Sequence, residues 1–238
     1  MTIKHEVITE GIQTDLIFEI YKGDCLEILP ALREVFSPFD FGFADPPYNV
    51  GKDYDGYDDK IDHEVYMGFT KRWLSQLTGF CKSVAVYPPK TKLLDYWNLI
   101  PDQHLLICAW SPEGAIRGNY VHQYIPLLVP PKPLVRTKDH WWNVQVPGLG
   151  YFYREEKFDH PGQTSLDITQ RIIKAFTSPG DWVLDPFGGV GTTAIACINL
   201  ERNCVLIEQS EKYCEIAKER IQKALMQPKL FTEKEANT

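Results

Sequence analysis

The order of apolar and polar positions along the 238-residue chain predicts strands that alternate with helices. Apolar runs of strand length cover residues 16–24, 39–45, 83–89, 104–110 and 124–130. Apolar residues at helical spacing cover 25–35 and 63–80. An irregular stretch rich in Pro, Trp and Tyr follows at roughly 130–160.

Regular order returns in the C-terminal part of the chain. The pattern there is a helix, a Pro-Gly turn, a strand at 181–185, a glycine-rich loop, a helix, a strand at 203–208 and a last helix. Strands that alternate with helices predict βαβ units and a parallel sheet, in which ligands bind at the carboxyl ends of the strands. Three polar motifs occupy such ends: Gly23-Asp24, Asp45-Pro-Pro-Tyr48 and the segment Asp185–Gly191.

The glycine-rich segment "DPFGGVGTT" has the features of a nucleotide-binding turn. Its glycines allow a ligand to approach the backbone, and the helix that follows presents free N–H groups. The next strand ends in Glu208, 17 residues after Gly191, where an acid suits the hydroxyls of a ribose. A strand–helix turn without a ligand is the alternative.

The segment "DPPY" predicts a site for an amino group. A carboxylate and a rigid backbone carbonyl, from Asp45 and Pro46, would accept both hydrogens of an amine, and Tyr48 would stack on the ring that bears it. A proline-rich strand exit with a solvated aspartate is the alternative. For Asp24 the alternatives are a contact with an exocyclic amine of a cofactor and an ordinary helix cap.

Composition narrows the class of protein. The apolar content of 44% suits one large domain, or one domain with a small insertion. The N-terminus lacks the apolar segment of a signal peptide, and no apolar run is long enough to span a membrane. Six scattered cysteines without a CxxC pair indicate reduced thiols in a cytoplasmic protein, and no metal site is expected.

Charge is segregated along the sequence. The net charge of −7 argues against a strongly basic nucleic-acid binder, and residues 51–63 are markedly acidic. Residues 115–138, in contrast, contain no Asp or Glu, and their basic residues are Arg117, Lys132, Arg136 and Lys138. We expect these to contact phosphates rather than bases, with a solvated surface as the alternative.

Two segments together resemble a known family. "DPPYN" near the N-terminus and "HPGQTSLDITQRIIKAFTSPGDWVLDPFGGVGTT" late in the chain are similar to the β group of S-adenosylmethionine-dependent DNA amino-methyltransferases, which act on adenine N6 or cytosine N4. In that group the order of motifs is circularly permuted, and here Asp45 precedes Gly189 by 144 residues, as the resemblance requires. The resemblance covers about residues 16–224.

The resemblance implies a fold and a setting. The expected fold is α/β: a circularly permuted Rossmann-like methyltransferase fold, with a mostly parallel seven-stranded sheet and helices on both faces. Residues 1–238 would form a single methyltransferase domain, with 131–160 as a short target-recognition insertion. Strands 16–22 and 203–208 would then be neighbours. The expected setting is the cytoplasm of a bacterial cell or a phage-infected host.

The resemblance also assigns roles. It implies site-specific transfer to a flipped adenine, with DNA as partner, S-adenosylmethionine as cofactor and no membrane association. The catalytic residues would be Asp45, Pro46, Pro47 and Tyr48. The cofactor-binding residues would be Asp24, Cys25, Asp185, Phe187, Gly189, Gly191, Thr192 and Glu208. The DNA-binding residues would be Arg117, Lys132, Arg136, Lys138 and Trp141, although the aromatic residues around Trp141 could equally form a small core of their own.

One departure and several alternatives remain. The family usually has His-Pro-Thr-(Gln/Glu)-Lys-Pro before the glycine loop, whereas this chain has His160-Pro-Gly-Gln-Thr-Ser165, without the lysine and the second proline. Cytosine N4 is the alternative acceptor, although that group more often carries serine in place of Asp45. RNA, a protein amide and a non-catalytic DNA-binding subunit are further alternatives, and a homodimer is left open.

Overall fold

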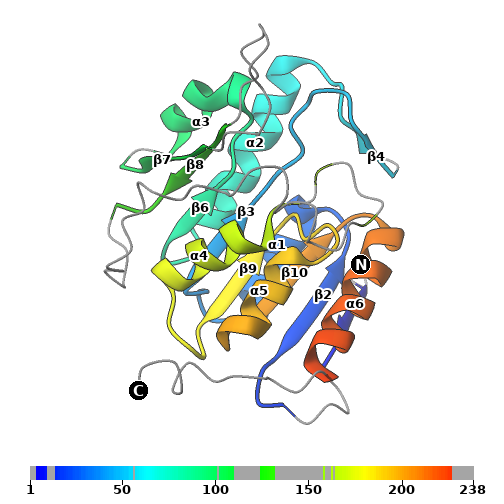
Figure 1. Ribbon diagram of the computed structural model, residues 1–238. Coiled ribbons are helices and arrows are strands. Elements are labelled where there is room, and N and C mark those ends of the chain that lie inside the picture. The colour runs from blue at the N-terminus through cyan, green and yellow to red at the C-terminus, as the bar shows by residue number, and fades with distance from the viewer. Residues whose placement is uncertain are drawn as a thin grey trace, which may run out of the picture.

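A central mixed sheet organises the computed structural model, which describes residues 4–9, 14–55, 57–100, 102–109, 124–131, 158, 162 and 164–226. The sheet has eight strands among the described residues, in the order β1-β2-β10-β9-β3-β6-β8-β7 (Figure 1). Their bounds are β1 Lys4–Val7, β2 Phe18–Lys22, β3 Phe41–Ala44, β6 Val84–Val86, β7 His104–Ala109, β8 Tyr124–Val129, β9 Trp182–Asp185 and β10 Asn203–Glu208.

The two ends of the sequence meet in the middle of the sheet. Strand β10 pairs in parallel with β2, with Leu206 opposite Ile20, and also pairs in parallel with β9. Strand β9 in turn pairs in parallel with β3, and β3 with β6. The predicted adjacency of strands 16–22 and 203–208 is therefore confirmed, together with the permuted α/β fold.

Helices cover both faces of the sheet (Figure 1). One face carries α4 (Leu166–Phe176), α5 (Thr192–Leu200) and α6 (Glu211–Met226), and the other carries α1 (Cys25–Val35), α2 (His63–Thr78) and α3 (Leu93–Leu99), which follows the short 3₁₀ helix η1 (Lys90–Lys92). No helix in the described ranges is both long and apolar enough to cross a membrane.

The alternation of side chains along the strands divides the core into two layers. Phe41 and Phe43 of β3 are buried against the α4–α5–α6 side, where Phe41 stacks on Phe176 of α4 with ring centroids 5.6 Å apart. Ala44 of β3 belongs to the layer on the α1–α2–α3 side. Because successive residues of a strand point to opposite faces, a short fully apolar strand serves both layers.

The structure adds an edge strand and a hairpin to the expected fold. Strand β1 pairs antiparallel with β2 at the sheet edge, and all four of its residues are exposed. The acidic segment forms a hairpin of β4 (Asp53–Tyr54) and β5 (Tyr57–Asp58). Helix α1 continues through Pro30, where the proline lacks the N–H that would bond the carbonyl four residues earlier.

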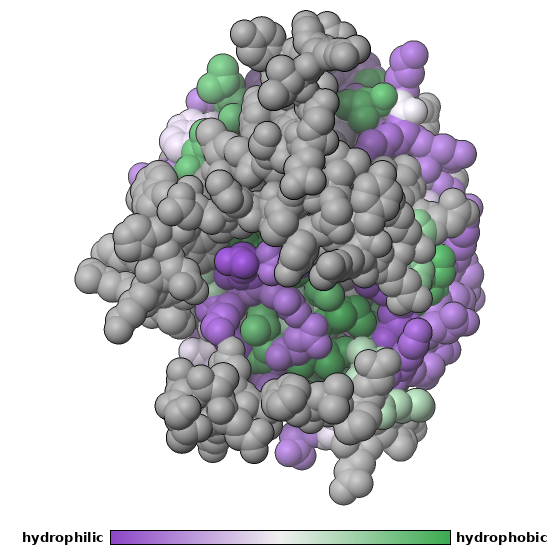
Figure 2. All heavy atoms as spheres, viewed as in Figure 1, coloured by the Kyte–Doolittle hydropathy of each residue, from purple (hydrophilic) through white to green (hydrophobic). Residues whose placement is uncertain are grey.

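Hydrophilic residues gather along one edge of the molecule. In Figure 2 they lie over the β4–β5 hairpin and α6. Exposed acids there include Asp53 and Asp55 of the hairpin and Glu211 of α6. This edge therefore includes Asp53 and Asp55, two of the acids of the segment 51–63.

Candidate active site

The three motif-bearing strand ends open into one cavity of about 890 Å³. Strands β2, β3 and β9 bring Asp24, Asp45 and Asp185 to its wall, and β10 brings Glu208. The predicted site residues that line it are Asp24, Cys25, Asp45, Pro46, Pro47, Tyr48, Asp185, Phe187, Gly189, Thr192 and Glu208. The expected convergence of the strand ends on one crevice is confirmed.

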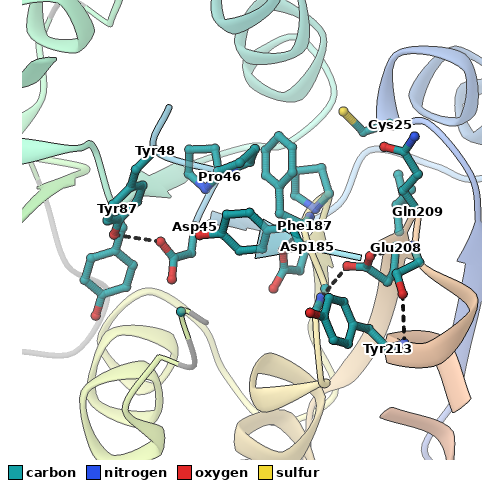
Figure 3. Close-up of a pocket in the computed structure, with 18 of the residues that line it drawn as sticks. Cys25, Asp45, Pro46, Tyr48, Tyr87, Asp185, Phe187, Glu208, Gln209 and Tyr213 are labelled. Carbon is teal, nitrogen blue, oxygen red and sulfur yellow. Dashed lines mark hydrogen bonds between the residues drawn. The ribbon is translucent and has the colours of Figure 1, made fainter. Parts of the chain in front are cut away.

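The exit of β3 fixes the Asp45 carboxylate from two directions. The Tyr48 hydroxyl donates a hydrogen bond of 2.9 Å to Asp45 Oδ1, as Figure 3 shows. The Thr164 hydroxyl donates a short hydrogen bond to Asp45 Oδ2. Both carboxylate oxygens are therefore held by neutral donors.

Neighbouring side chains tie back two of the three carbonyls that follow Asp45. The Tyr66 hydroxyl donates to the Pro47 carbonyl at 2.9 Å, and Lys92 Nζ donates to the Tyr48 carbonyl at 3.2 Å. No hydrogen bond from the part of the chain that the structure describes reaches the Pro46 carbonyl. The carbonyl that directly follows Asp45 thus keeps its acceptor capacity, and Pro46 lines the cavity.

The loop after Tyr48 is organised by two side chains. The buried Asp59 carboxylate accepts hydrogen bonds from the backbone N–H groups of Asn49, Val50 and Lys52, at 2.6–3.1 Å. The Asn49 amide bonds both the N–H and the carbonyl of Ile61. Asn49 itself has a φ of 56°, in the left-handed region that asparagine tolerates. The loop therefore places Lys52 and the hairpin over the cavity.

The hairpin contributes charged and aromatic groups to the cavity wall. Lys52 Nζ lies 5.5 Å from the centroid of the Tyr48 ring, a cation–π distance. The Ser210 hydroxyl, directly after β10, donates a hydrogen bond of 2.5 Å to Asp55 of the hairpin. The hairpin is thus attached to the end of β10, beside Glu208.

The glycine loop holds Asp185 and Phe187 in fixed positions. Asp185 accepts hydrogen bonds from the Phe187 N–H (2.9 Å) and the Thr193 hydroxyl (2.5 Å). The Phe187 ring packs edge-on against Trp73 of α2, with centroids 5.0 Å apart. At Gly188 an added Cβ would lie 2.9 Å from the Cβ of Leu206, so only glycine lets the loop lie directly on β10.

Glu208 is held by the backbone on both sides. Its carboxylate accepts hydrogen bonds from the N–H groups of Gly189 (2.7 Å) and Ser210 (2.8 Å). Each carboxylate oxygen retains a second lone pair. The side chain is therefore fixed in the cavity wall and still has acceptor capacity.

Three carboxylates stand in a row across the cavity, from Asp45 through Asp185 to Glu208 (Figure 3). Burial raises the pKa of Asp45 to about 6, against the lowering effects of Thr164, Tyr48 and Lys52. Burial, with the nearby charges of Asp45 and Glu208, raises the pKa of Asp185 to about 7. Burial also raises the pKa of Glu208. The site is accordingly suited to a cationic ligand, which would stabilise the ionised carboxylates.

Two predicted cofactor residues take structural positions. Gly191 does not line the cavity: its φ is 81°, it caps the N-terminus of α5, and an added Cβ would meet the Cβ of Ala217 at 2.9 Å. The absence of a side chain lets α5 pack closely on α6, and a role of Gly191 in cofactor binding stays a prediction. Asp24 caps α1 by accepting from the Leu26 N–H at 2.8 Å while also lining the cavity.

Sequence reasoning missed several residues of the cavity wall. Thr164, Lys52, Tyr54, Phe69 and Arg72 line it without having been assigned a role. The departure "HPGQTS" was the available signal for Thr164, and the acidic loop was the signal for the hairpin residues. The expected DNA-binding residues Arg117, Lys132, Arg136, Lys138 and Trp141 lie outside the described residues, as do nearly all residues of 131–160.

Known proteins with related sequences and folds are DNA methyltransferases. A family profile described as DNA methylase matches residues 90–219. The type II methyltransferase M2.MboI of Moraxella bovis is 26% identical over 246 residues, covering 87% of this chain and 88% of that protein. The crystal structure of an M1.HpyAVI–SAM complex matches with a TM-score of 0.63 and 23% identity, covering 84% of this chain and 98% of the other.

A second solved structure comes from an enzyme whose description names its target base. The PvuII DNA methyltransferase, described as cytosine-N4-specific, matches with a TM-score of 0.61 and 16% identity, covering 92% of this chain and 89% of the other. At these identities the two structural matches show a shared fold.

Proposed function

The chain belongs to the DNA methylase family, whose profile matches more than half of it, and from this premise we propose that it methylates the exocyclic N6 of adenine in DNA. S-adenosylmethionine is the methyl donor. The observation that carries the proposal is the exit of β3, where a doubly held carboxylate and a carbonyl that keeps its acceptor capacity follow one another at Asp45 and Pro46.

The residues of the cavity fit this cofactor. Its volume of about 890 Å³ lies within the range of pockets for ligands of this size. The buried Asp185 and the half-buried Glu208 carboxylates favour the cation, and Glu208 keeps lone pairs for ribose hydroxyls. Phe187 and Ile207 supply apolar wall, and Asp24 lines the cavity while it caps α1.

The cofactor supplies an electrophilic methyl group on a sulfonium sulfur: the acceptor nitrogen forms a bond to this carbon while the carbon–sulfur bond breaks and its electron pair stays on sulfur. The protein has two tasks in such a displacement, namely orientation of the amine and stabilisation of the charge that develops on it. Metal coordination is not part of this scheme.

Asp45 and the Pro46 carbonyl orient the amine. Each accepts one of its two hydrogens, so that the nitrogen lone pair points away from both acceptors and toward the methyl group. The hydrogen bonds from Tyr48 and Thr164 keep the carboxylate from rotating. As the nitrogen becomes positive, the negative charge of Asp45 stabilises it, and the surplus proton leaves toward this carboxylate and then to solvent.

Tyr48 holds the base. A base inside a duplex is out of reach, so the target nucleotide must be flipped into the cavity. The Tyr48 ring lines the cavity with its hydroxyl fixed on Asp45. Stacking of a base on an aromatic side chain contributes about 1–3 kcal/mol, which helps to offset the cost of unpairing.

The choice of adenine over cytosine rests on Asp45. By resemblance, cytosine-N4 enzymes of this group more often have serine at this position, whereas this chain has aspartate. Cytosine N4 is the second candidate, because the chain shares its fold with the cytosine-N4-specific PvuII enzyme.

Residues 131–160 are proposed as the target-recognition insertion of a single methyltransferase domain. The basic residues Lys132, Arg136 and Lys138 would contact phosphates there, and Trp141 would contact the DNA. Relatives such as M2.MboI are type II methyltransferases, so a restriction–modification system in a bacterial cytoplasm is the proposed setting.

The deciding experiment uses unmethylated DNA and methyl-labelled S-adenosylmethionine. After incubation with the protein, the DNA is digested and its nucleosides are separated. We expect label in N6-methyladenine with the wild-type protein and none with Asp45→Ala. Label in N4-methylcytosine would replace adenine by cytosine as the acceptor, and absence of label in any nucleoside of genomic DNA would overturn the proposal.

A further inference from the structure

The Asp45 carboxylate is contacted by a side chain from a distant part of the sequence. Tyr48, which holds Oδ1, belongs to the same strand exit, whereas Thr164, which holds Oδ2, lies 119 residues further along the chain. Thr164 immediately precedes Ser165, the residue that caps α4. The contact therefore joins the exit of β3 to the start of α4.

Both partners of this contact are carried by rigid elements. The Ser165 carbonyl accepts hydrogen bonds from the Thr169 N–H (3.0 Å) and its hydroxyl (2.9 Å), which fixes the first turn of α4. Phe176 of α4 stacks on Phe41 of β3, with an angle of 7° between the rings. Packing of α4 against β3 thus sets the position of Thr164 relative to Asp45, as a precisely held site requires.

The groups around Asp45 allow a hydroxyl donor to stabilise its ionised carboxylate. Lys52 from the hairpin loop favours its charge, whereas Asp185 of β9 opposes it. Tyr48 donates to it, and Tyr87, after β6, lies close enough to influence Tyr48. In such a partly desolvated position a hydrogen bond to the charged form matters more than in water.

Thr164 occupies a position at which this chain departs from the family pattern. By resemblance, the family usually has lysine at this point of the His-Pro segment. Here the chain has a neutral donor at position 164, and the cation near Asp45 is Lys52, from the hairpin. At Gly162 an added Cβ would lie 3.4 Å from Lys52 Nζ and 3.1 Å from the Tyr54 hydroxyl, so the absence of a side chain at 162 leaves room for both.

We propose that Thr164 is a positioning residue for methyl transfer: its hydroxyl fixes the Asp45 carboxylate in the orientation that receives the acceptor amine. This inference rests on the proposed function. It differs from a merely structural role, in which Thr164 would only begin α4 and its loss would lower stability without changing the chemistry.

The test compares Thr164→Val, which keeps the shape and removes the hydroxyl, with Thr164→Ser, which keeps the hydroxyl. Thr78→Val is the matched control, because the Thr78 hydroxyl bonds only its own helix, at Leu74 and Ser75. For Thr164→Val we expect kcat to fall 10- to 100-fold and the Kd for S-adenosylmethionine to stay within threefold. We expect Thr164→Ser to recover at least a third of wild-type kcat, and Thr78→Val to match the wild type.

The pH profile separates positioning from stability. Loss of a donor to the ionised form raises the pKa of Asp45, so the acidic limb of kcat should move to higher pH in Thr164→Val and return in Thr164→Ser. Carbon-13 NMR of aspartate-labelled protein, with Asp45→Asn to assign the signal, reports the same pKa without turnover.

The outcomes are distinguishable. Suppose that the wild type is active and that a folded Thr164→Val protein has the same kcat and the same acidic limb. This result overturns the present inference and leaves the proposed function standing. A serine variant as slow as the valine variant does so too. A wild type that methylates no DNA overturns the proposed function and this inference with it, whatever the NMR titration shows.

Discussion

Asp45 and Asp185 face one cavity from neighbouring parallel strands, with Gly42 of β3 paired to Leu184 of β9. Each is held by two hydrogen-bond donors, and burial raises the pKa of both, to about 6 for Asp45 and about 7 for Asp185. Two carboxylates in such a position resist ionising together. The pH behaviour of the protein follows from this pair.

The stability of the protein should depend on pH through Asp185. The folded state holds this proton up to a pH of about 7, whereas an unfolded aspartate loses it near 3.8, so this group lowers the free energy of unfolding as pH rises from about 4 to about 7. Asp185→Asn should remove this loss of stability. The difference in Tm between the variant and the wild type should therefore favour the variant more at pH 8 than at pH 5. Calorimetry across this range provides the measurement. The control is Asp167→Asn, at a half-buried aspartate that pairs with Arg171. An Asp185→Asn curve parallel to the wild type would contradict the prediction.

Binding of S-adenosylmethionine should release protons. A sulfonium near Asp185 and Glu208 favours the ionised forms of these two carboxyl groups, whereas S-adenosylhomocysteine lacks this charge. The ratio of the affinity for S-adenosylmethionine to the affinity for S-adenosylhomocysteine should therefore rise between pH 5.5 and 8. The rise is about tenfold for each unit by which the sulfonium lowers the pKa of a carboxyl group. Titration calorimetry in buffers of different ionisation enthalpy measures the released protons directly. Equal proton release for the two ligands would count against this arrangement of charges.

Loss of the Asp45 carboxylate should separate binding from chemistry. We expect Asp45→Ala, and the closer isostere Asp45→Asn, to lower kcat by at least 100-fold, a typical effect of removing a group that stabilises developing charge. The Kd for the cofactor should stay within about threefold, because the glycine loop and Glu208 are unchanged. Single-turnover assays and equilibrium dialysis measure the two quantities. A folded variant that no longer binds the cofactor would refute this division of roles.

Glu208 should contribute to cofactor affinity. In Glu208→Gln one backbone donor loses its carboxylate partner, and the negative charge at the end of β10 disappears. We expect the Kd for S-adenosylmethionine to rise about 10-fold or more, in keeping with the greater strength of hydrogen bonds to charged groups. Glu211→Gln, three residues further on and in a surface ion pair with Lys22, is the matched control. Similar affinities for the two variants would argue against a role for Glu208.

DNA affinity should be modest, strongly salt-dependent and only weakly sequence-selective. A segment as short as 131–160 offers few side chains to read base edges, so we expect a target of a few bases around one adenine. Arg136→Ala and Lys138→Ala should weaken binding to all sequences alike and reduce the salt slope by about 0.9 for each phosphate that the variant no longer neutralises. Fluorescence anisotropy at several salt concentrations measures the slope. A strict target of six or more bases in a genome-wide methylation map would contradict the expected selectivity.

Much of the fold follows from local pattern. The strands around 16–24, 39–45, 181–185 and 203–208 and the helices from Cys25 and His63 agree with the structure, because each has the spacing of a buried strand or an amphipathic helix. The β4–β5 hairpin was not predicted. It has only two residues in each strand and is organised by Asp59 and Asn49, and such side-chain contacts across ten residues leave no periodic signal.

The site was predictable where a motif ends a strand, and not where it depends on contacts between distant segments. Asp45, Asp185 and Glu208 occupy strand ends, so topology alone brings them together. Thr164 and Ser210 reach their partners Asp45 and Asp55 from more than 100 residues away, through packing that the sequence does not display. Gly191 lies within a predicted ligand motif, and its lack of a side chain also allows α5 to pack closely on α6.

The pairing of β10 with β2 and of β9 with β3 has a consequence for synthesis of the protein. Strands β2 and β3 leave the ribosome early, but the two strands that lie between them in the sheet are among the last to emerge. Until then Asp24 and Asp45 have no common wall, and the edges of β2 and β3 that later pair with β10 and β9 remain unpaired. The nascent chain must therefore keep these edges from other partners until its final quarter arrives, and its cavity is complete only once β9 and β10 are in place.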